Sequence, residues 1–296
     1  MTLNFKFTVI LIMAFVAAAF SQKNNNSIKL LDANLTNFEK YIGVPHITVI
    51  GLPEGTYQSE TVTKGKPLGL NNDLKNVFTT TNINGETILN ITGEIYGCIT
   101  TKENYSNYHF STMFKWGNKK WEPRLNRRKD TGILYHSYGE HGRFWSTWKT
   151  CLEFQVQETD LGDFISLSAN TIQPNPGGPI VYIRGDAEAK TKQFNPNFDT
   201  YFEGKGYINA YLEPQAPHGS WNHLELYVIG NDAVHIVNGE IVMVVENAIN
   251  PETNKPLTEG QIQIQSEAAE CYYKEMTITP ITEFPKFIVE HVKFKS

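Results

Sequence analysis

Hydrophobic and polar residues alternate along much of this chain. The clearest case is Cys151-Leu-Glu-Phe-Gln-Val-Gln157, where the Leu, Phe and Val side chains would point to one side and the Glu and Gln side chains to the other. Gln261-Ile-Gln-Ile-Gln265 alternates in the same way. A period of two residues is typical of a half-buried β-strand, and both segments are therefore predicted to be strands.

Other segments rich in Val, Ile, Tyr and Phe are separated by Gly, Pro and Asn, which is the pattern of short strands and turns. They are Ile88–Thr92, Tyr96–Thr101, Tyr108–Trp116, Gly132–Ser137, Phe164–Ser168, Ile180–Ile183, Trp221–Ile229, Ala233–Val237, Glu240–Glu246 and Cys271–Thr279. Asn238-Gly239 lies between two of them and supplies the two positive-φ residues of a type I′ hairpin turn. Residues 31–40 fit a short helix or a strand equally well. The chain is therefore predicted to be all-β, a single antiparallel β-sandwich of jelly-roll type over residues 22–296.

The N-terminus has the pattern of a secretory signal peptide. Val9–Phe20 is apolar throughout, Lys6 precedes it, and Ala19-Phe-Ser21 resembles a cleavage site. The apolar run is too short for a comfortable membrane span. We therefore expect a signal peptide over residues 1–21, no membrane span after its cleavage, and a periplasmic or secreted protein.

Charge and composition narrow the choice of partners. The formal net charge is −5, and loss of Lys6 with the signal peptide makes it more negative by one unit. The one basic run, Arg124–Lys129, has the composition of a loop. Nucleic acid is therefore an unfavourable partner. An acidic, aromatic-rich protein is better suited to neutral polyols.

The three cysteines are Cys98, Cys151 and Cys271. In an exported protein two of them could pair and leave one thiol. Because each lies in or beside an apolar, strand-like stretch, we favour three buried thiols that act as small hydrophobic side chains.

Glu153-x-Gln155-x-x-Glu158 is the first candidate for chemistry. Its spacing resembles the Glu-x-Asp-x-x-Glu strand of laminarinase-like retaining glycosidases, in which two glutamates act as nucleophile and acid/base. Gln155 replaces the central Asp, and this departure counts against ordinary glycosidase chemistry. Alternatively, the strand presents a solvated face and Glu158 only caps its end.

His136 and Lys115 are the other catalytic candidates. His136 lies on a short predicted strand just before Glu153 in the chain, and consecutive antiparallel strands are often neighbours. Lys115 alternates with Phe114 and Trp116 and could stabilise developing negative charge if it lies in a cleft. Either side chain could instead be structural or solvent-facing.

A loop-like segment, residues 139–148, carries the candidates for ligand contact. His141, Arg143 and Trp145 occur there among Gly, Ser and Thr, and indole rings in loops above a sheet commonly stack on sugar rings. Trp116 and Trp221 lie in predicted strands, where core packing is favoured. Glu158-Thr-Asp-Leu-Gly-Asp163 is an acidic turn whose oxygen atoms would suit Ca²⁺, although a plain Asp/Gly turn is the favoured interpretation.

Several motifs together resemble the 3-keto-disaccharide hydrolase domain family, in the same order from residue 30 to residue 280. They are Val44–His46, Pro67–Asn72, Gly93–Gly97, Tyr108–Gly117, Lys120–Pro123, Thr131–Ser137, Glu153–Glu158 with Gly162-Asp163, Gly219–Asn222 and Val237–Gly239.

The resemblance implies a concanavalin-like β-sandwich that cleaves glycosides whose C3 hydroxyl a partner sugar oxidoreductase has already oxidised. The ketone acidifies the C2 hydrogen, a base removes it, the C1 substituent leaves by β-elimination, and water then adds to the enone. Such chemistry needs a base, an enolate stabiliser and an acid, but not two close carboxylates. On this interpretation Glu153 or His136 acts as base and acid. Lys115, with Gln155 or a bound divalent metal, stabilises the enolate. The residues that bind the substrate are His141, Arg143, Trp145 and Glu158.

Two other functions remain open. A retaining glycosidase would act on unmodified β-glucans, and a carbohydrate-binding module would bind sugars without turnover. The aglycone, the linkage and any metal requirement are not set by the sequence.

Overall fold

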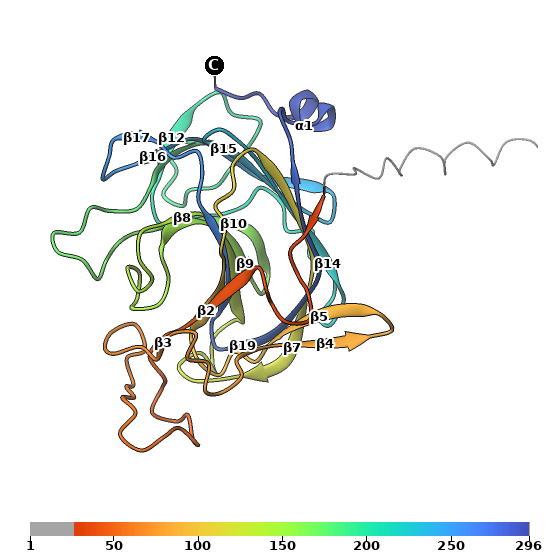
Figure 1. Cartoon of the computed structure of the whole chain (residues 1–296). Helices are drawn as coiled ribbons and strands as arrows, with labels where there is room; N and C mark the ends of the chain where they lie inside the picture. The colour runs from red at the N-terminus through yellow and green to blue at the C-terminus, as the bar shows by residue number, and fades with distance from the viewer. Residues whose placement is uncertain (1–26, 296) are drawn as a thin grey trace, which may run out of the picture.

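The computed structural model describes residues 27–295, and these form two large antiparallel sheets that face each other (Figure 1). The first sheet has eleven strands in the order β12-β11-β16-β15-β14-β7-β19-β5-β4, with β1 paired to β19 and β17 to β16. The second has eight strands in the order β13-β10-β9-β8-β18-β6-β2-β3. The predicted all-β sandwich is confirmed.

The strands of the eleven-stranded sheet are β1 (Ile28–Lys29), β4 (Phe78–Ile83), β5 (Glu86–Ile91), β7 (Tyr108–Lys120), β11 (Ile180–Arg184), β12 (Tyr201–Gly204), β14 (Asn222–Ile229), β15 (Asp232–Val237), β16 (Glu240–Asn250), β17 (Lys255–Pro256) and β19 (Ala269–Pro280). Those of the eight-stranded sheet are β2 (Phe38–Ile42), β3 (Gly69–Leu70), β6 (Gly97–Thr101), β8 (Asp130–Tyr138), β9 (Thr150–Gln157), β10 (Asp160–Leu167), β13 (Tyr207–Ile208) and β18 (Gln261–Ser266). A short helix, α1 (Lys286–His291), follows β19.

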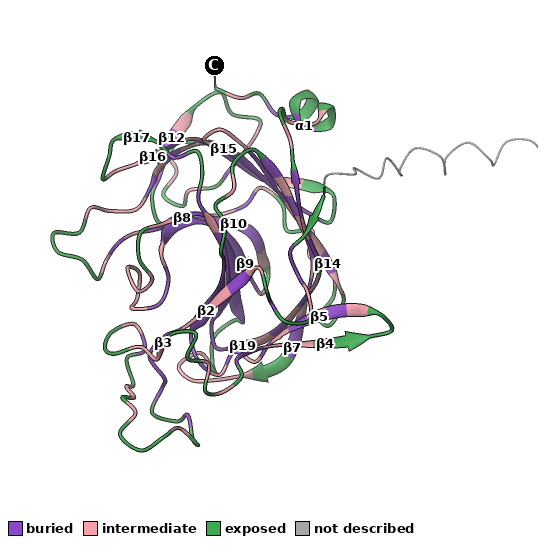
Figure 2. Cartoon of the chain, in the orientation of Figure 1, coloured by how far each residue is buried: buried purple, intermediate pink, exposed green. Residues whose placement is uncertain are grey.

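The main core lies between the two sheets, where the inward side chains of alternating strands meet. Buried residues are concentrated on the facing strands and exposed ones in the loops (Figure 2). Leu152, Phe154 and Val156 of β9 join this core, as their alternation predicts. The ambiguous stretch around residues 31–40 forms a turn that leads into β2 rather than a helix.

Turn geometry and bulges set the local register. Asn238 and Gly239 have φ values of 51° and 86° and connect β15 to β16, so the predicted hairpin is confirmed. A bulge interrupts the β8–β9 pairing between Tyr135 and Tyr138, and another interrupts the β9–β10 pairing between Leu161 and Phe164. Strand β9 itself continues without a bulge.

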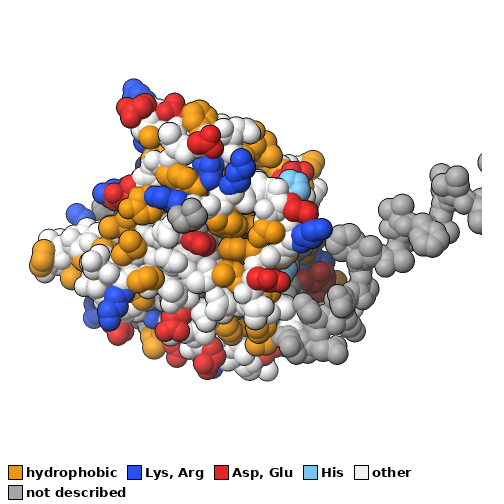
Figure 3. All heavy atoms as spheres, turned by 90° about the horizontal axis from the view of Figure 1, so that it is seen from above, with side chains coloured by type: hydrophobic (Ala, Val, Ile, Leu, Met, Phe, Trp, Pro, Cys, Tyr) orange, Lys and Arg blue, Asp and Glu red, His pale blue; other side chains and the backbone are white. Residues whose placement is uncertain are grey.

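All three cysteines are buried and unpaired, as favoured from their surroundings. Among residues 27–295 no helix is long and apolar enough to cross a membrane. The predicted signal peptide lies outside the described residues, so export stays a prediction. On the surface in Figure 3, charged side chains of both signs are interspersed with apolar and neutral ones.

Candidate functional site

The outer face of the eight-stranded sheet, which points away from the main core, carries a row of carboxyl and amide groups near its centre. Glu153, Gln155 and Gln157 extend from β9 to this side, because their neighbours Leu152, Phe154 and Val156 fill the core. Asp130 of β8 pairs with Gln157, and Glu267, which follows β18, forms a bridge with Asp130. Three segments of the chain therefore contribute to one polar cluster, together with Arg124 from the loop between β7 and β8.

Arg124 is shared between two of the carboxylates. Its Nη1 donates to Glu267 Oε1 at 2.8 Å, and its Nη2 is paired with Asp130 Oδ2. Gln157 Nε2 donates to the same Asp130 oxygen at 2.8 Å. Asp130 Oδ1 is buried without a hydrogen-bond partner. One guanidinium is therefore paired with two carboxyl groups of the cluster, and Glu153 is the third carboxyl group.

Glu153 fits into this cluster because residue 132 is a glycine. A Cβ at Gly132 would lie 2.1 Å from Glu153 Oε1 and 2.9 Å from Gln265 Oε1. The Glu153 carboxyl group therefore lies directly over the backbone of β8. Burial, reinforced by the nearby Asp130 and Glu267, raises the pKa of Glu153 well above its usual value, and Arg124 only partly opposes this. Burial likewise raises the pKa of Asp130 to about 6.

The structure corrects the expectation that this face is half exposed. Every residue of β9 is buried, and Glu153 is only 3% exposed. A second apolar cluster covers part of the face. It contains Val62, Tyr96, Cys98, Leu134, Trp148, Cys151, Leu167 and Ala268, with Tyr41, Trp121, Phe144, Trp145 and Ile165 packed against it. Alternation placed the polar side chains on the correct face, but it could not reveal that loops fold over them.

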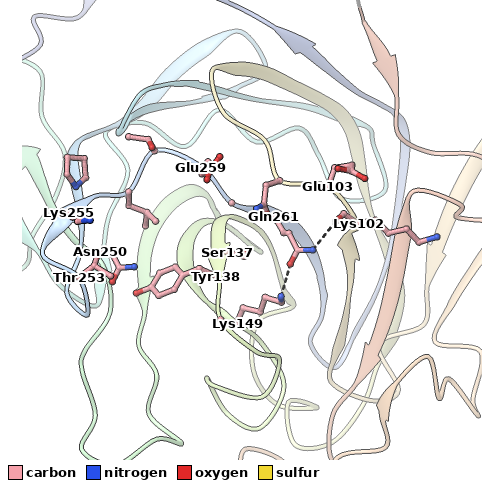
Figure 4. Close-up of a pocket in the computed structure, with 16 residues that line it drawn as sticks. Lys102, Glu103, Ser137, Tyr138, Lys149, Asn250, Thr253, Lys255, Glu259 and Gln261 are labelled. Atoms are coloured by element: carbon pink, nitrogen blue, oxygen red, sulfur yellow. Dashed lines mark hydrogen bonds between the residues drawn. The ribbon is translucent and has the colours of Figure 1, made fainter.

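An open pocket of about 740 Å³ lies at the edge of the sheet where β8 ends and β9 begins. Lys149 and Tyr138 line it together with the segment from Asn250 to Gln261 (Figure 4). Lys149 Nζ donates to Gln261 Oε1 at 2.6 Å, and burial lowers the pKa of this lysine. Gln261 in turn donates to the carbonyl groups of Thr101 and Lys102.

His136 lies at the β8 bulge, with φ of 51°, and is 1% exposed. Neither ring nitrogen has a hydrogen-bond partner among the described residues, and burial alone lowers the pKa of His136 to about 4. No hydrogen bond or ion pair in the described chain joins it to Glu153. Strands β8 and β9 are neighbours, as expected for these two residues. The assignment of Glu153 and His136 as base and acid stays a prediction.

Lys115 belongs to β7 in the other sheet. Phe114 and Trp116 beside it face the main core, so Lys115 points outward, where its Nζ lies 4.9 Å from the Trp221 ring centre and 5.2 Å from that of Tyr272. The whole core separates this side of the sandwich from Glu153. The expected convergence of Lys115 with Glu153 and His136 is therefore wrong.

The predicted contact residues of the 139–148 loop are used in packing. His141 stacks on Tyr41 with ring centres 4.6 Å apart and hydrogen-bonds to Thr100, and burial lowers the pKa of His141 to about 3. Arg143 forms an ion pair with Glu252. Trp145 stacks on Phe144 as part of the apolar cover. Their assignment to substrate binding stays a prediction.

Glu158 does not join Glu153 in a glycosidase-type pair. It lies in the β9–β10 turn, is partly exposed, and its Oε1 is 3.9 Å from Lys129 Nζ. The bulge that would bring it to the face of Glu153 is found in β10 instead of β9. The laminarinase-like geometry suggested by the spacing is therefore not formed, although the role of Glu158 in substrate binding stays a prediction.

Sequence reasoning missed Arg124, Asp130, Gln265 and Glu267 as members of the cluster. Two of them carried a signal: Arg124 begins the one basic run, and Gln265 ends an alternating strand. Asp130 is the first residue of β8, and Glu267 directly follows β18. The ends of neighbouring antiparallel strands can bring two such carboxyl groups together. Only the order of strands in the sheet identifies these neighbours.

The stability of the protein should depend on pH through this cluster. The folded state keeps the Glu153 proton to a higher pH than the unfolded chain does. The free energy of unfolding therefore decreases as pH rises from the pKa of Glu153 in the unfolded chain to its higher pKa in the folded state. His136 and His235, whose pKa values burial lowers to about 4 and about 3, act in the opposite sense below pH 6.5, where the unfolded chain binds more protons. Glu267, whose pKa burial raises to about 8, acts in the same sense as Glu153. We therefore expect the thermal midpoint to fall as pH rises from about 6.5 to about 8.

Glu153→Gln should flatten this decline because glutamine has no proton to lose. Thermal unfolding followed by circular dichroism at a series of pH values measures the effect. An equally steep decline in the variant would contradict the assignment of a buried, protonated Glu153.

Comparisons with solved structures return β-rich carbohydrate proteins at low similarity. A candidate glycosyl hydrolase from Parabacteroides distasonis is 14% identical with a TM-score of 0.44, and the match covers 87% of this chain and 100% of that one. LamAcat from Zobellia galactanivorans is 11% identical with a TM-score of 0.41, and the match covers 86% of this chain and 98% of that one. The carbohydrate-binding module CBM66 from Bacillus subtilis is 11% identical, TM-score 0.39, covering 68% and 91%. The search of curated protein sequences gave no match.

A family model gives the decisive comparison. Residues 58–279 match the model of the 3-keto-alpha-glucoside-1,2-lyase-like domain, and this range is more than half of the 296 residues. It contains β3 to most of β19, and so every residue of the Glu153 cluster. The chain is therefore a carbohydrate-active protein that belongs to the family of 3-keto-alpha-glucoside-1,2-lyase-like domains.

Proposed function

We propose that this protein cleaves 3-keto-glycosides by removing the C2 proton and expelling the C1 substituent, after which water adds to the enone. The observation that carries the proposal is the buried group of Glu153, Asp130 and Arg124 on the sheet face, within the matched family domain. Buried carboxyl groups with displaced pKa values are typical of acid–base sites.

The different environments of the two carboxyl groups suggest a division of roles. Burial raises the pKa of Glu153 well above its usual value, which favours the protonated carboxyl group, and Glu153 would donate this proton to the departing C1 oxygen as the general acid. Asp130, whose pKa burial raises to about 6, is ionised at neutral pH, and its partner-free Oδ1 would accept the C2 proton as the base. Arg124 would stabilise the enolate oxygen that forms at C3. These neighbours replace His136 and Lys115 in the earlier assignment.

The proposal requires the substrate to reach the cluster. Arg124 belongs to the β7–β8 loop, residues 121–129, of which residues 125–128 are exposed. Its backbone is held at its two ends, by bonds from Trp121 N to Ala268 O and from Glu158 N to Lys129 O, and between them by turns within the loop. Movement of this loop would lift Arg124 and admit a sugar ring. The substrate also requires an earlier oxidation of its C3 hydroxyl, so a sugar oxidoreductase must supply it.

The test compares two chromogenic substrates. The protein should release nitrophenol from a nitrophenyl 3-keto-glucoside, assayed as both anomers, and leave the matching unmodified glucosides intact. Cleavage of the unmodified glucosides at a similar rate would overturn the proposal in favour of a conventional glycosidase.

A non-catalytic carbohydrate-binding function is the second candidate. It is favoured by the 3% exposure of Glu153 and by the open pocket at Lys149 and Tyr138, which contains none of the cluster residues. In that case a 3-keto-glucoside would bind without turnover at high protein concentration. Lys149→Met would then lower the affinity measured by calorimetry, whereas Glu153→Gln would not.

A further inference from the structure

A second group of carboxylates lies one strand further out on the same face of the sheet. Asp160 and Asp163 belong to β10, and Glu213 lies in the segment after β13. Each offers a carboxylate oxygen, and these oxygens all lie within 4.8 Å of one another. Two oxygens bound to one Ca²⁺ at about 2.4 Å can be separated by at most about twice that distance, so the spacing fits a shared cation.

The bulge in β10 explains why two aspartates three residues apart share one side of the strand. In a regular strand Asp160 and Asp163 would point to opposite faces. The extra residue between Leu161 and Phe164, where Gly162 has a φ of 94°, restores both to the outer face. Gly162 also allows close packing, since a Cβ there would lie 2.3 Å from a methyl group of Val242.

Asp163 supplies an independent sign of a ligand. It is fully buried, with 0% exposure, and its Oδ1 accepts the Ala210 N–H at 2.6 Å. Its Oδ2 is buried and has no hydrogen-bond partner among residues 27–295. The nearby Tyr207 hydroxyl has a single proton, which it donates to Asp160 Oδ2 at 3.1 Å. A buried carboxylate oxygen without a partner is costly, and a cation would remove that cost.

The protein supplies only a partial counter-charge. Arg128 pairs with Asp160 and donates to Thr159 Oγ1 at 2.9 Å, but its side chain is 51% exposed. No other Lys or Arg of the described chain forms an ion pair with these three carboxylates. Three carboxyl groups therefore share a single, half-exposed cation of the protein next to a buried carboxylate oxygen.

We propose that Asp160, Asp163 and Glu213 bind a divalent cation of the calcium type. The cation would join the β9–β10 turn to the segment that follows the edge strand β13. A bond from Thr159 N to Gln215 Oε1, 3.1 Å long, already connects the same two regions. The site is separate from the Glu153 cluster and does not depend on the proposed activity.

The experiment titrates the chelator-treated protein with CaCl₂ by isothermal calorimetry and follows thermal unfolding in parallel. We expect one site, and a thermal midpoint raised by about 3 °C or more at saturation. Asp163→Asn keeps an oxygen for the Ala210 N–H but loses a ligand, and Glu213→Gln alters an exposed residue that should not affect folding. Both should weaken binding by about tenfold or more, since each removes a charged ligand. Arg128→Met should strengthen binding because it removes a competing cation.

Asp199→Asn, the same change at an exposed side chain in another loop, is the matched control and should bind Ca²⁺ like the parent protein. Absence of calcium binding, or unchanged binding in both Asp163→Asn and Glu213→Gln, would overturn the site. Equal or tighter binding of Mg²⁺ in the same titration would overturn its assignment to calcium.

Discussion

Glu153→Gln should reduce the turnover of a 3-keto-glucoside by at least about 100-fold, the usual contribution of a positioned proton donor. Glutamine has nearly the same shape and can occupy the space over Gly132, so the fold should remain intact. What glutamine lacks is an acidic proton, which burial favours on Glu153 by raising the pKa of its carboxyl group. The measurement is the steady-state rate of nitrophenol release. The variant should lose more of the turnover rate on substrates with poorer leaving groups than on the nitrophenyl substrate, because expulsion of a poor leaving group depends more on the general acid.

Glu225→Gln is the matched control for this variant. The substitution is the same, but Glu225 lies in β14 of the other sheet, where it pairs with His109 at 2.9 Å. It should keep the parent rate. Parent-like activity in Glu153→Gln, with a normal unfolding transition, would show that Glu153 does not act in the reaction.

Gly132→Ala should disturb the site without replacing any ionisable residue. The added Cβ would lie 2.1 Å from Glu153 Oε1, so the carboxyl group must move away from its position over β8. We expect a loss of about 1–3 kcal/mol in the free energy of unfolding, as for other overpacked interiors. We also expect turnover to fall by about tenfold or more, because small displacements of catalytic groups are costly. Denaturant unfolding and the same rate assay measure the two effects.

A double-mutant cycle separates this clash from a general backbone effect. In a Glu153→Ala background the carboxyl group is absent, so Gly132→Ala should cost much less stability than it does in the parent. An equal cost in both backgrounds would mean that the glycine is needed for the strand itself rather than for Glu153.

The sequence predicted the fold well because strand patterns are local. Alternation identified β9 and β18, and Asn238-Gly239 identified the β15–β16 hairpin. The second apolar layer was not predictable in the same way. Trp148 and Tyr96 are distant in the chain and meet only because loops fold back over the sheet, where Trp148 Nε1 donates to Gly97 O.

The candidate site was predicted in part, for a related physical reason. Glu153 and Gln155 were placed on the correct face by period alone. Lys115 was placed with them wrongly, because its outward direction is a property of β7 and says nothing about which sheet contains β7. The bulge at His136 and the burial of its ring were not predicted, because neither has a clear signal in the residue types. Arg124 and Asp130 required the strand order.

The central claim is that the reaction begins at the C2–H bond, and deuterium incorporation tests it directly. The parent protein is allowed to act on a 3-keto-glucoside in D₂O, with an enzyme-free sample correcting for spontaneous exchange next to the ketone, and the sugar product is examined by NMR and mass spectrometry. Elimination followed by hydration predicts deuterium at C2 of the released sugar, or the unsaturated product itself if hydration is slow. Release of the sugar with its original hydrogen at C2 would contradict the account.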